Sequence, residues 1–236
     1  MPNQTQKKAE TSLKKGKIRV GILFGGRSAE HEVSLQSAKN VVEALDKTKF
    51  EPVLIGIEKS GRWQLAEGSK YLLNTENPKL IALNESNREV AIVPGHQENQ
   101  LVEFDGKKNE GVDVIFPVLH GTYGEDGTIQ GILKLSNIPF VGAGVLGSAV
   151  GMDKDVMKRL LREAGLPVAK FMVVRRGERK DLTFEKVKKE VGLPFFVKPA
   201  NLGSSIGVNK VHEKSEFNVA IDNAFLHDNK ILIVEG

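Results

Sequence analysis

The segment HGTYGEDGTIQG, from His120 to Gly131, places one histidine and two carboxylates among four glycines. Glycines alone are enough to form a tight turn, so the ionisable side chains indicate that something is bound here. His120 follows the apolar run VDVIFPVL, which is typical of a strand buried on both faces. We therefore expect its imidazole at the carboxyl edge of a parallel sheet, where open α/β sheets bind ligands. The alternative is a core histidine satisfied by backbone groups.

The two carboxylates of this segment have different expected roles. Asp126 precedes TIQGILKLS, a predicted helix, and aspartate is a favoured N-cap residue. Helix capping is therefore the simplest interpretation of Asp126. Glu125 is freer, and we expect it to orient His120 or a neighbouring backbone group.

A second motif, FGGRSAEHEVS, joins a predicted strand to the predicted helix SAEHEVSLQSAKNVVEALDK. Glu30 and Glu32 lie in the first turn of that helix, where unpaired N–H groups and the helix dipole favour carboxylates. Simple helix-end chemistry is one interpretation. Gly25 and Gly26 also allow a ligand to approach the backbone closely, and an acidic side chain there would hold an ammonium group.

A third motif, FFVKPANLGSSIG, suits an anion. Lys198 leaves an apolar strand just before a loop in which Gly203, Ser204 and Ser205 offer backbone N–H groups and two hydroxyls. Such a loop can hold phosphate, although its lysine precedes the glycines and the pattern is not a Walker A sequence. Lys154, near the start of the predicted helix MDKDVMKRLLREAG, adds a second cation. The alternative is a pair of solvated lysines.

The elements that must position these residues indicate an α/β protein. Short apolar strands alternate with amphipathic helices, which predicts a parallel sheet in the first half of the chain. Asp153 and Gly165 bound the clearest helix, and the Gly-Ser-Ser loop lies within a predicted hairpin. We expect three parts, at residues 1–17 (a flexible basic tail), 18–147 (an N-terminal domain) and 148–236 (a second lobe).

Composition excludes several classes of protein. The 236 residues include no cysteine, which excludes disulfides and thiolate metal sites. No apolar run is long enough to span a bilayer and no secretory signal is present, so we expect a cytoplasmic protein that binds no membrane. The net charge of +4 equals the excess of five lysines over one glutamate in the first seventeen residues. The rest is nearly neutral, which argues against nucleic-acid binding.

One further pattern is rejected. GAGVLG, from Gly142 to Gly147, matches the G-x-G-x-x-G fingerprint of dinucleotide-binding proteins. That fingerprint needs an acidic residue after a second strand, about 20 residues further on. Glu163 is the nearest candidate and lies within a predicted helix, so we do not expect a nicotinamide or flavin site.

Taken in order, the motifs GGRSAEHEVSLQSA, HGTYGEDGTIQG, GSAVGMDKDVMK and FVKPANLGSSIGV resemble those of the D-alanine–D-alanine ligase family, in the ATP-grasp superfamily. The resemblance covers residues 18–236. It implies an N-terminal Rossmann-like, or pre-ATP-grasp, parallel-sheet domain followed by an α+β ATP-grasp lobe that is truncated at its C-terminus.

The resemblance also implies roles for individual residues. Glu30 would anchor the ammonium of the first D-alanine, His120 would lie beside its carboxylate, and Ser204 would link Glu30 to a closing loop; these three form the expected catalytic set. Glu125 would also bind substrate. The expected ATP-binding residues are Lys154, Lys198, Ser204, Ser205 and Glu235, the last at the adenine-binding hinge.

The implied reaction is ATP-dependent ligation of two D-alanines through an acyl phosphate, for peptidoglycan precursor synthesis, with Mg²⁺ or Mn²⁺. Because the family continues beyond Gly236 and its metal ligands are expected there, we interpret the chain as a fragment that is not active alone. A homodimer is possible. The alternatives are a D-alanine–D-lactate or D-alanine–D-serine ligase, or a noncatalytic nucleotide-binding module.

Overall fold

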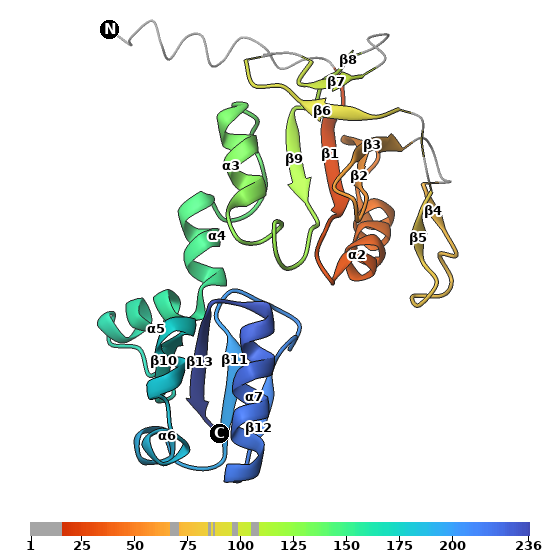
Figure 1. Cartoon of the computed structure of the whole chain (residues 1–236). Helices are drawn as coiled ribbons and strands as arrows, with labels where there is room; N and C mark the ends of the chain where they lie inside the picture. The colour runs from red at the N-terminus through yellow and green to blue at the C-terminus, as the bar shows by residue number, and fades with distance from the viewer. Residues whose placement is uncertain (1–15, 67–70, 85, 87, 96–98, 105–108) are drawn as a thin grey trace, which may run out of the picture.

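The structure is a computed structural model that describes residues 16–66, 71–84, 86, 88–95, 99–104 and 109–236. Almost all of the basic tail expected at residues 1–17 lies outside the described residues. The chain forms two lobes, each built on its own four-stranded sheet (Figure 1). None of the described helices is long and apolar enough to cross a membrane.

The first lobe contains a mainly parallel sheet in the order β3-β2-β1-β9. Strand β1 pairs in parallel with both β2 and β9, whereas β3 pairs antiparallel with β2. These strands are β1 (Ile18–Gly25), β2 (Phe50–Ile57), β3 (Trp63–Ala66) and β9 (Val114–Pro117). The parallel sheet predicted for the first half of the chain is therefore confirmed.

Alternation along β1 explains how helices cover both faces of this sheet. Ile22 and Phe24 pack with Leu35 of α2 (His31–Ala44), whereas Leu23 packs with Leu133 of α3 (Thr128–Leu135). All five side chains are completely buried. Successive side chains of a strand point to opposite faces, so a continuous apolar run is needed when both faces are covered.

Short strands extend the first lobe beyond this sheet. β4 and β5 form one hairpin, and β6, β7 and β8 form a small antiparallel sheet. Their bounds are β4 (Leu72–Leu73), β5 (Ala82–Leu83), β6 (Val90–Ile92), β7 (Leu101–Glu103) and β8 (Asn109–Glu110).

The second lobe has an antiparallel sheet in the order β10-β13-β11-β12. Helices α6 (Phe184–Val191) and α7 (Lys214–His227) cover one face, where Phe184, Phe195 and Phe217 pack in a cluster of rings. The strands are β10 (Phe171–Arg175), β11 (Phe195–Pro199), β12 (Asn209–Val211) and β13 (Lys230–Glu235), with a 3₁₀ helix η2 (Arg176–Asp181). The predicted hairpin around the Gly-Ser-Ser loop is β11–β12.

Two helices connect the lobes (Figure 1). They are α4 (Val145–Met152) and α5 (Lys154–Glu163). Gly144 is the N-cap residue of α4, so GAGVLG leads into a connecting helix, and Glu163 ends α5. A glycine motif that opens a helix is compatible with the fingerprint, so the rejection of a dinucleotide site depends on Glu163, which lies in a helix and does not follow a second strand.

The start of α5 is fixed by an ion-pair network. Asp153 caps the helix, as predicted, because its carboxylate accepts hydrogen bonds from the backbone N–H groups of Asp155 and Val156. The Nζ atom of Lys230, in β13, lies 2.5 Å from Asp153 and 3.4 Å from Asp155. This network joins α5 to the second sheet and so fixes the position of Lys154.

We predict that Asp153→Ala lowers the free energy of unfolding by about 2–4 kcal/mol, because it removes a helix cap and one partner of a largely buried ammonium. Asp153→Asn should cost less, since asparagine is also a good N-cap residue. Chemical denaturation of the three proteins measures both losses. Equal losses for the two variants would show that the cap contributes nothing.

The same pair predicts a dependence of stability on pH. Burial alone would raise the pKa of Asp153, but the hydrogen bond and charge of Lys230, with two backbone N–H groups, lower it below its ordinary value. The unfolded chain then binds the proton at higher pH than the folded chain. The stabilisation is complete above about pH 4 and is lost as pH falls through the lowered pKa. Asp153→Asn should lack this part of the acid sensitivity in denaturation experiments.

Candidate active site

Glu30 lies where three segments of the chain meet. It is the N-cap residue of α2, but its side chain makes no capping hydrogen bond. Its carboxylate instead accepts a hydrogen bond from the hydroxyl of Ser204, in the other lobe. A Cβ atom at Gly121 or Gly203 would contact this carboxylate. The Glu30 side chain therefore makes no capping hydrogen bond at the helix end, and its carboxylate instead contacts the loops at 121 and 203–204.

The loop between β11 and β12 reaches both lobes. At its start, the Lys154 ammonium donates hydrogen bonds to the carbonyl oxygens of Ala200 and Leu202. At its tip, Ser204 and Ser205 have φ angles of 49° and 59°, in the left-handed region that only a well-supported backbone maintains. Both serines are exposed to solvent, and Ser204 contacts Glu30. Five residues of chain thus connect Lys154 to Glu30.

His120 is held by serines of the β1–α2 segment. The Ser28 hydroxyl donates to its carbonyl oxygen at 2.7 Å, and the Ser37 hydroxyl lies 2.9 Å from its Nε2 atom. The Ser34 hydroxyl donates to the carbonyl of Val118, also on the segment that follows β9. The half-buried imidazole therefore meets a side chain and is not a core histidine satisfied by the backbone.

Ser34 and Ser37 were not identified from the sequence, although a signal was present. Glu30, Ser34 and Ser37 are spaced at i, i+4 and i+7, which places them on one face of a helix. This spacing predicts that Ser34 and Ser37 share the helix face of Glu30.

Glu125 and Asp126 stabilise their own loop. Glu125 accepts a hydrogen bond of 2.7 Å from the Gly121 amide, so it orders the backbone beside His120. Asp126 accepts hydrogen bonds from the amides of Tyr123 and Thr128. The expectation that Asp126 is the N-cap residue is wrong by one position, because Gly127, with φ 93°, occupies the cap of α3. The Asp126 carboxylate nevertheless accepts a hydrogen bond from the amide of Thr128, the first residue of α3.

Three lysines, Lys154, Lys158 and Lys198, lie near one another beside the loop between β11 and β12. Burial lowers the pKa of Lys154, and repulsion from Lys198 lowers it further. Burial likewise lowers the pKa of Lys198, with a contribution from Lys158. Among the described residues, the Lys198 ammonium has no hydrogen-bond or ion-pair partner, so this cluster favours an anionic ligand. Lys158 was missed in the sequence, although it lies one helical turn after Lys154.

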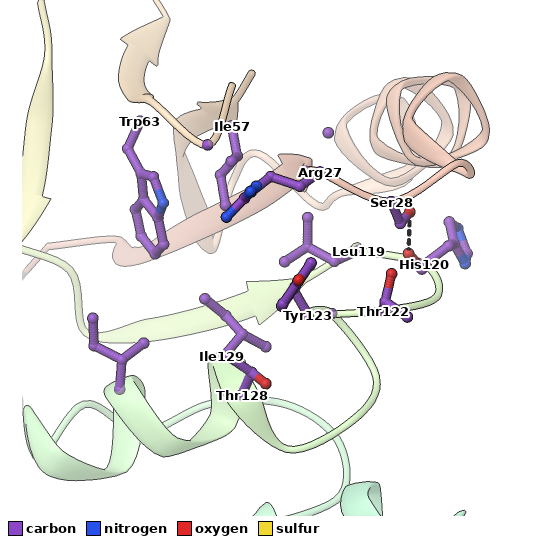
Figure 2. Close-up of a pocket in the computed structure, with 15 residues that line it drawn as sticks. Arg27, Ser28, Ile57, Trp63, Leu119, His120, Thr122, Tyr123, Thr128 and Ile129 are labelled. Carbon is purple, nitrogen blue, oxygen red and sulfur yellow. Dashed lines mark hydrogen bonds between the residues drawn. The ribbon is translucent and has the colours of Figure 1, made fainter. Parts of the chain in front are cut away.

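A cavity of about 580 Å³ is lined by both lobes and, among the three lysines, by Lys154. Its polar lining includes Glu125, Gln130, Ser148 and Lys154. A second cavity of about 250 Å³ lies next to the loop after β9 and is lined mainly by apolar side chains, including Ile57, Trp63 and Ile129 (Figure 2). His120 also lines this smaller cavity, although its ring points away from these apolar side chains (Figure 2). The larger cavity therefore suits a charged ligand better.

Glu235 lies apart from this cluster. It ends β13, and its carboxylate accepts a 2.8 Å hydrogen bond from the Lys170 amide. Among the described residues it shares no hydrogen bond with the other predicted site residues. Within the same part of the chain, no group of three or more histidine, aspartate or glutamate side chains is arranged to hold a metal ion.

A parallel α/β lobe followed by an antiparallel lobe, with lysines and a serine loop between them, defines an ATP-grasp protein. Family models agree: residues 19–143 match "D-ala D-ala ligase N-terminus", and residues 160–236 match "D-ala D-ala ligase C-terminus". The chain belongs to the D-alanine–D-alanine ligase family.

Individual relatives support this assignment. The chain is 56% identical to the D-alanine–D-alanine ligase of Shouchella clausii and 53% identical to D-alanine–D-alanine ligase A of Escherichia coli K12, each over 221 residues. These matches cover 92% and 93% of this chain but only 59% and 61% of the relatives. The chain therefore spans about 60% of the length of these relatives.

Solved structures give the same fold. The VanG D-Ala:D-Ser ligase of Enterococcus faecalis has a TM-score of 0.80 at 38% identity, covering 94% of this chain and 63% of that one. The D-alanine–D-alanine ligase of Coxiella burnetii has a TM-score of 0.79 at 31% identity, with coverages of 93% and 62%.

We predict that Gly121→Ala displaces Glu30 and loosens the β11–β12 loop. Gly121 has a φ of 71°, and its added Cβ would contact the Glu30 carboxylate. Strain alone should lower the free energy of unfolding by about 1–2 kcal/mol, and the contact should add to this loss. Hydrogen exchange of the amides at 203–206 should also become faster.

Gly165→Ala is the matched control, because Gly165 has a φ of 74° and nothing within 4 Å of an added Cβ. It should show the strain without faster exchange in the loop. Equal exchange rates at 203–206 in both variants would contradict the enclosure of Glu30 by Gly121.

Proposed function

We propose that this chain forms the part of a D-alanine–D-alanine ligase that binds the first amino acid and the phosphates of ATP. The main support is the loop from Ala200 to Ser204, which joins the Lys154 ammonium to the Glu30 carboxylate. A cation for phosphate and an anion for an amino group are thereby connected through one short segment. The overall reaction would be ligation of two D-alanines through an acyl phosphate, for peptidoglycan precursor synthesis.

The first D-alanine would use two groups of the first lobe. Its ammonium would pair with Glu30, and its carboxylate would lie beside His120. Glu125 would act on this substrate through the Gly121 amide that it binds. In the proposed reaction this carboxylate would attack the γ-phosphate of an ATP held by the lysines.

Electrostatics explains why lysines are needed at this point. A carboxylate and a triphosphate repel each other, and unit charges 4 Å apart interact by about 4 kcal/mol at an effective dielectric constant near 20. Lys154 and Lys198 would offset this repulsion and stabilise the charge that develops during transfer. The loop carrying Ser204 and Ser205 would exclude water from an acyl phosphate that water hydrolyses.

The described residues fit ATP better than they fit its metal. The partly buried lysines and the adjoining cavity suit the phosphates, and Glu235, at the end of β13, is proposed to meet the adenine. Bound ATP would supply the phosphoryl group that activates the carboxylate. Because the described side chains form no cluster for Mg²⁺ or Mn²⁺, we derive no step through a metal.

The second amino acid is a separate question. The VanG structure is named as a D-Ala:D-Ser ligase and has the same fold as this chain. Ligation of D-alanine to D-serine is therefore a second candidate activity that uses the same Glu30 and His120 site.

We also propose a cytoplasmic location and a domain boundary within α4, near residue 147.

The function is tested by calorimetry and by turnover. ATP with Mg²⁺ should bind to the 236-residue chain, and Glu30→Gln should leave that binding unchanged. In a relative of full length, the matching Glu-to-Gln change should chiefly raise the KM for the first D-alanine, measured by ADP release. No ATP binding by the chain would refute the nucleotide site. ADP release dependent on D-serine would favour the second candidate.

We predict that Lys198→Met weakens ATP binding about 10- to 100-fold, because it removes a charge-assisted hydrogen bond to phosphate. Lys134→Met, which changes an exposed lysine of α3, should leave the affinity unchanged. Calorimetry of both variants provides the measurement. An unchanged affinity for Lys198→Met would remove Lys198 from the phosphate site.

The lowered pKa of Lys198 predicts a dependence on pH. A bound anion stabilises the charged ammonium, so ATP affinity should fall as pH rises through this pKa, which lies below about 10.4. Between the lowered pKa and 10.4 the unfolded chain binds more protons, so the ligand-free protein should gain stability as pH rises. Both effects should be smaller in Lys198→Met.

A further inference from the structure

The imidazole of His120 has one hydrogen-bond partner in the described part of the chain. Its Nε2 atom lies 2.9 Å from the Ser37 hydroxyl, on α2, and its Nδ1 atom has no partner there. Two other serines of this region, Ser28 and Ser34, bind backbone carbonyl oxygens of the same segment. Ser37 is thus the serine of this group that contacts the ring.

The direction of the Ser37 hydrogen bond decides which ring nitrogen carries the proton. A helical serine often donates to the carbonyl four residues earlier, but Ser37 makes no such bond to Val33 in the described structure. If Ser37 donates to Nε2, one group remains unpaired, the Nδ1–H. If Nε2–H donates to Ser37, both the hydroxyl hydrogen and the Nδ1 lone pair remain unpaired. Fewer unpaired polar groups favour the first arrangement.

We propose that Ser37 is a positioning residue that donates to Nε2 of His120 and holds the imidazole in its Nδ1–H tautomer. The neutral ring then presents Nδ1–H as a hydrogen-bond donor to a carboxylate oxygen of the ligand. The Ser28 bond fixes the backbone of His120, and the Ser37 bond fixes its ring.

This role deepens the proposed function and rests on it for the identity of the ligand. A free amino acid carries an ammonium and a carboxylate at a fixed short separation. Glu30 would accept from the ammonium, and a neutral histidine locked as a donor would meet the carboxylate. Fixing the tautomer before binding removes the cost of selecting it when the ligand arrives.

The test is ¹⁵N NMR of ring-labelled histidine in the 236-residue chain, about two pH units above the ordinary histidine pKa of about 6.5. His120→Gln identifies the resonances. The wild-type ring should show a protonated Nδ1 and an unprotonated Nε2. Ser37→Ala should move the ring toward the Nε2–H tautomer, which free histidine favours, whereas Ser37→Thr should retain the wild-type pattern.

Ser28→Ala is the matched control, because it removes a serine bond to His120 without touching the ring, and the tautomer should not change. A protonated Nε2 in the wild-type chain would overturn the proposal, and so would an unchanged pattern in Ser37→Ala. The wild-type spectrum alone tests the direction of the bond if Ser37→Ala does not fold.

Addition of D-alanine separates this proposal from the proposed function. Binding should shift the Nδ1 resonance of His120, and Ser37→Ala should weaken the affinity roughly tenfold, as expected for one misdirected hydrogen bond. A confirmed tautomer without any shift on D-alanine addition would overturn the assignment of Nδ1 to the carboxylate of this substrate. It would leave Ser37 as the residue that sets the tautomer.

Discussion

A carboxylate enclosed between two lobes is the constraint on which this structure depends. Glu30 is carried by the first lobe, but its hydrogen-bond partner, Ser204, belongs to the second. A Cβ atom at Gly121 would lie 2.2 Å from a carboxylate oxygen of Glu30, and one at Gly203 would lie 3.2 Å from it, so a side chain at Gly121 would displace the carboxylate. The left-handed backbone of Ser204 is supported by the same contact.

Electrostatic repulsion is the second constraint. Burial lowers the pKa values of Lys154 and Lys198, and repulsion from Lys198 on the first and from Lys158 on the second lowers them further, so the charged cluster costs stability in the absence of an anion. The ion pair of Lys230 with Asp153 keeps α5 in place against this repulsion. A site prepared in this way loses little free energy to rearrangement when its ligand binds, because its cations are already positioned. Stability is thus given up locally to favour binding.

The sequence predicted what local patterns determine. Apolar runs indicated the strands of the parallel sheet, and Asp153 with Gly165 indicated the bounds of α5. The pairing of Ser37 with His120 joins residues 83 positions apart, and spacing alone carries no information about such partners. The N-cap predicted at Asp126 was wrong by one position, because Gly127, which has a positive φ, occupies the cap of α3. The roles given to Glu30, Lys198 and Glu235 stay predictions.

The ammonium of Lys154 carries three N–H donors, and two of them bind the carbonyl oxygens of Ala200 and Leu202. One donor remains. An oxygen of a bound ligand can accept from this third donor while the two existing bonds persist. Ligand binding and anchoring of the β11–β12 hairpin by Lys154 therefore do not compete. An arginine here would spread its donors over a wider planar fork.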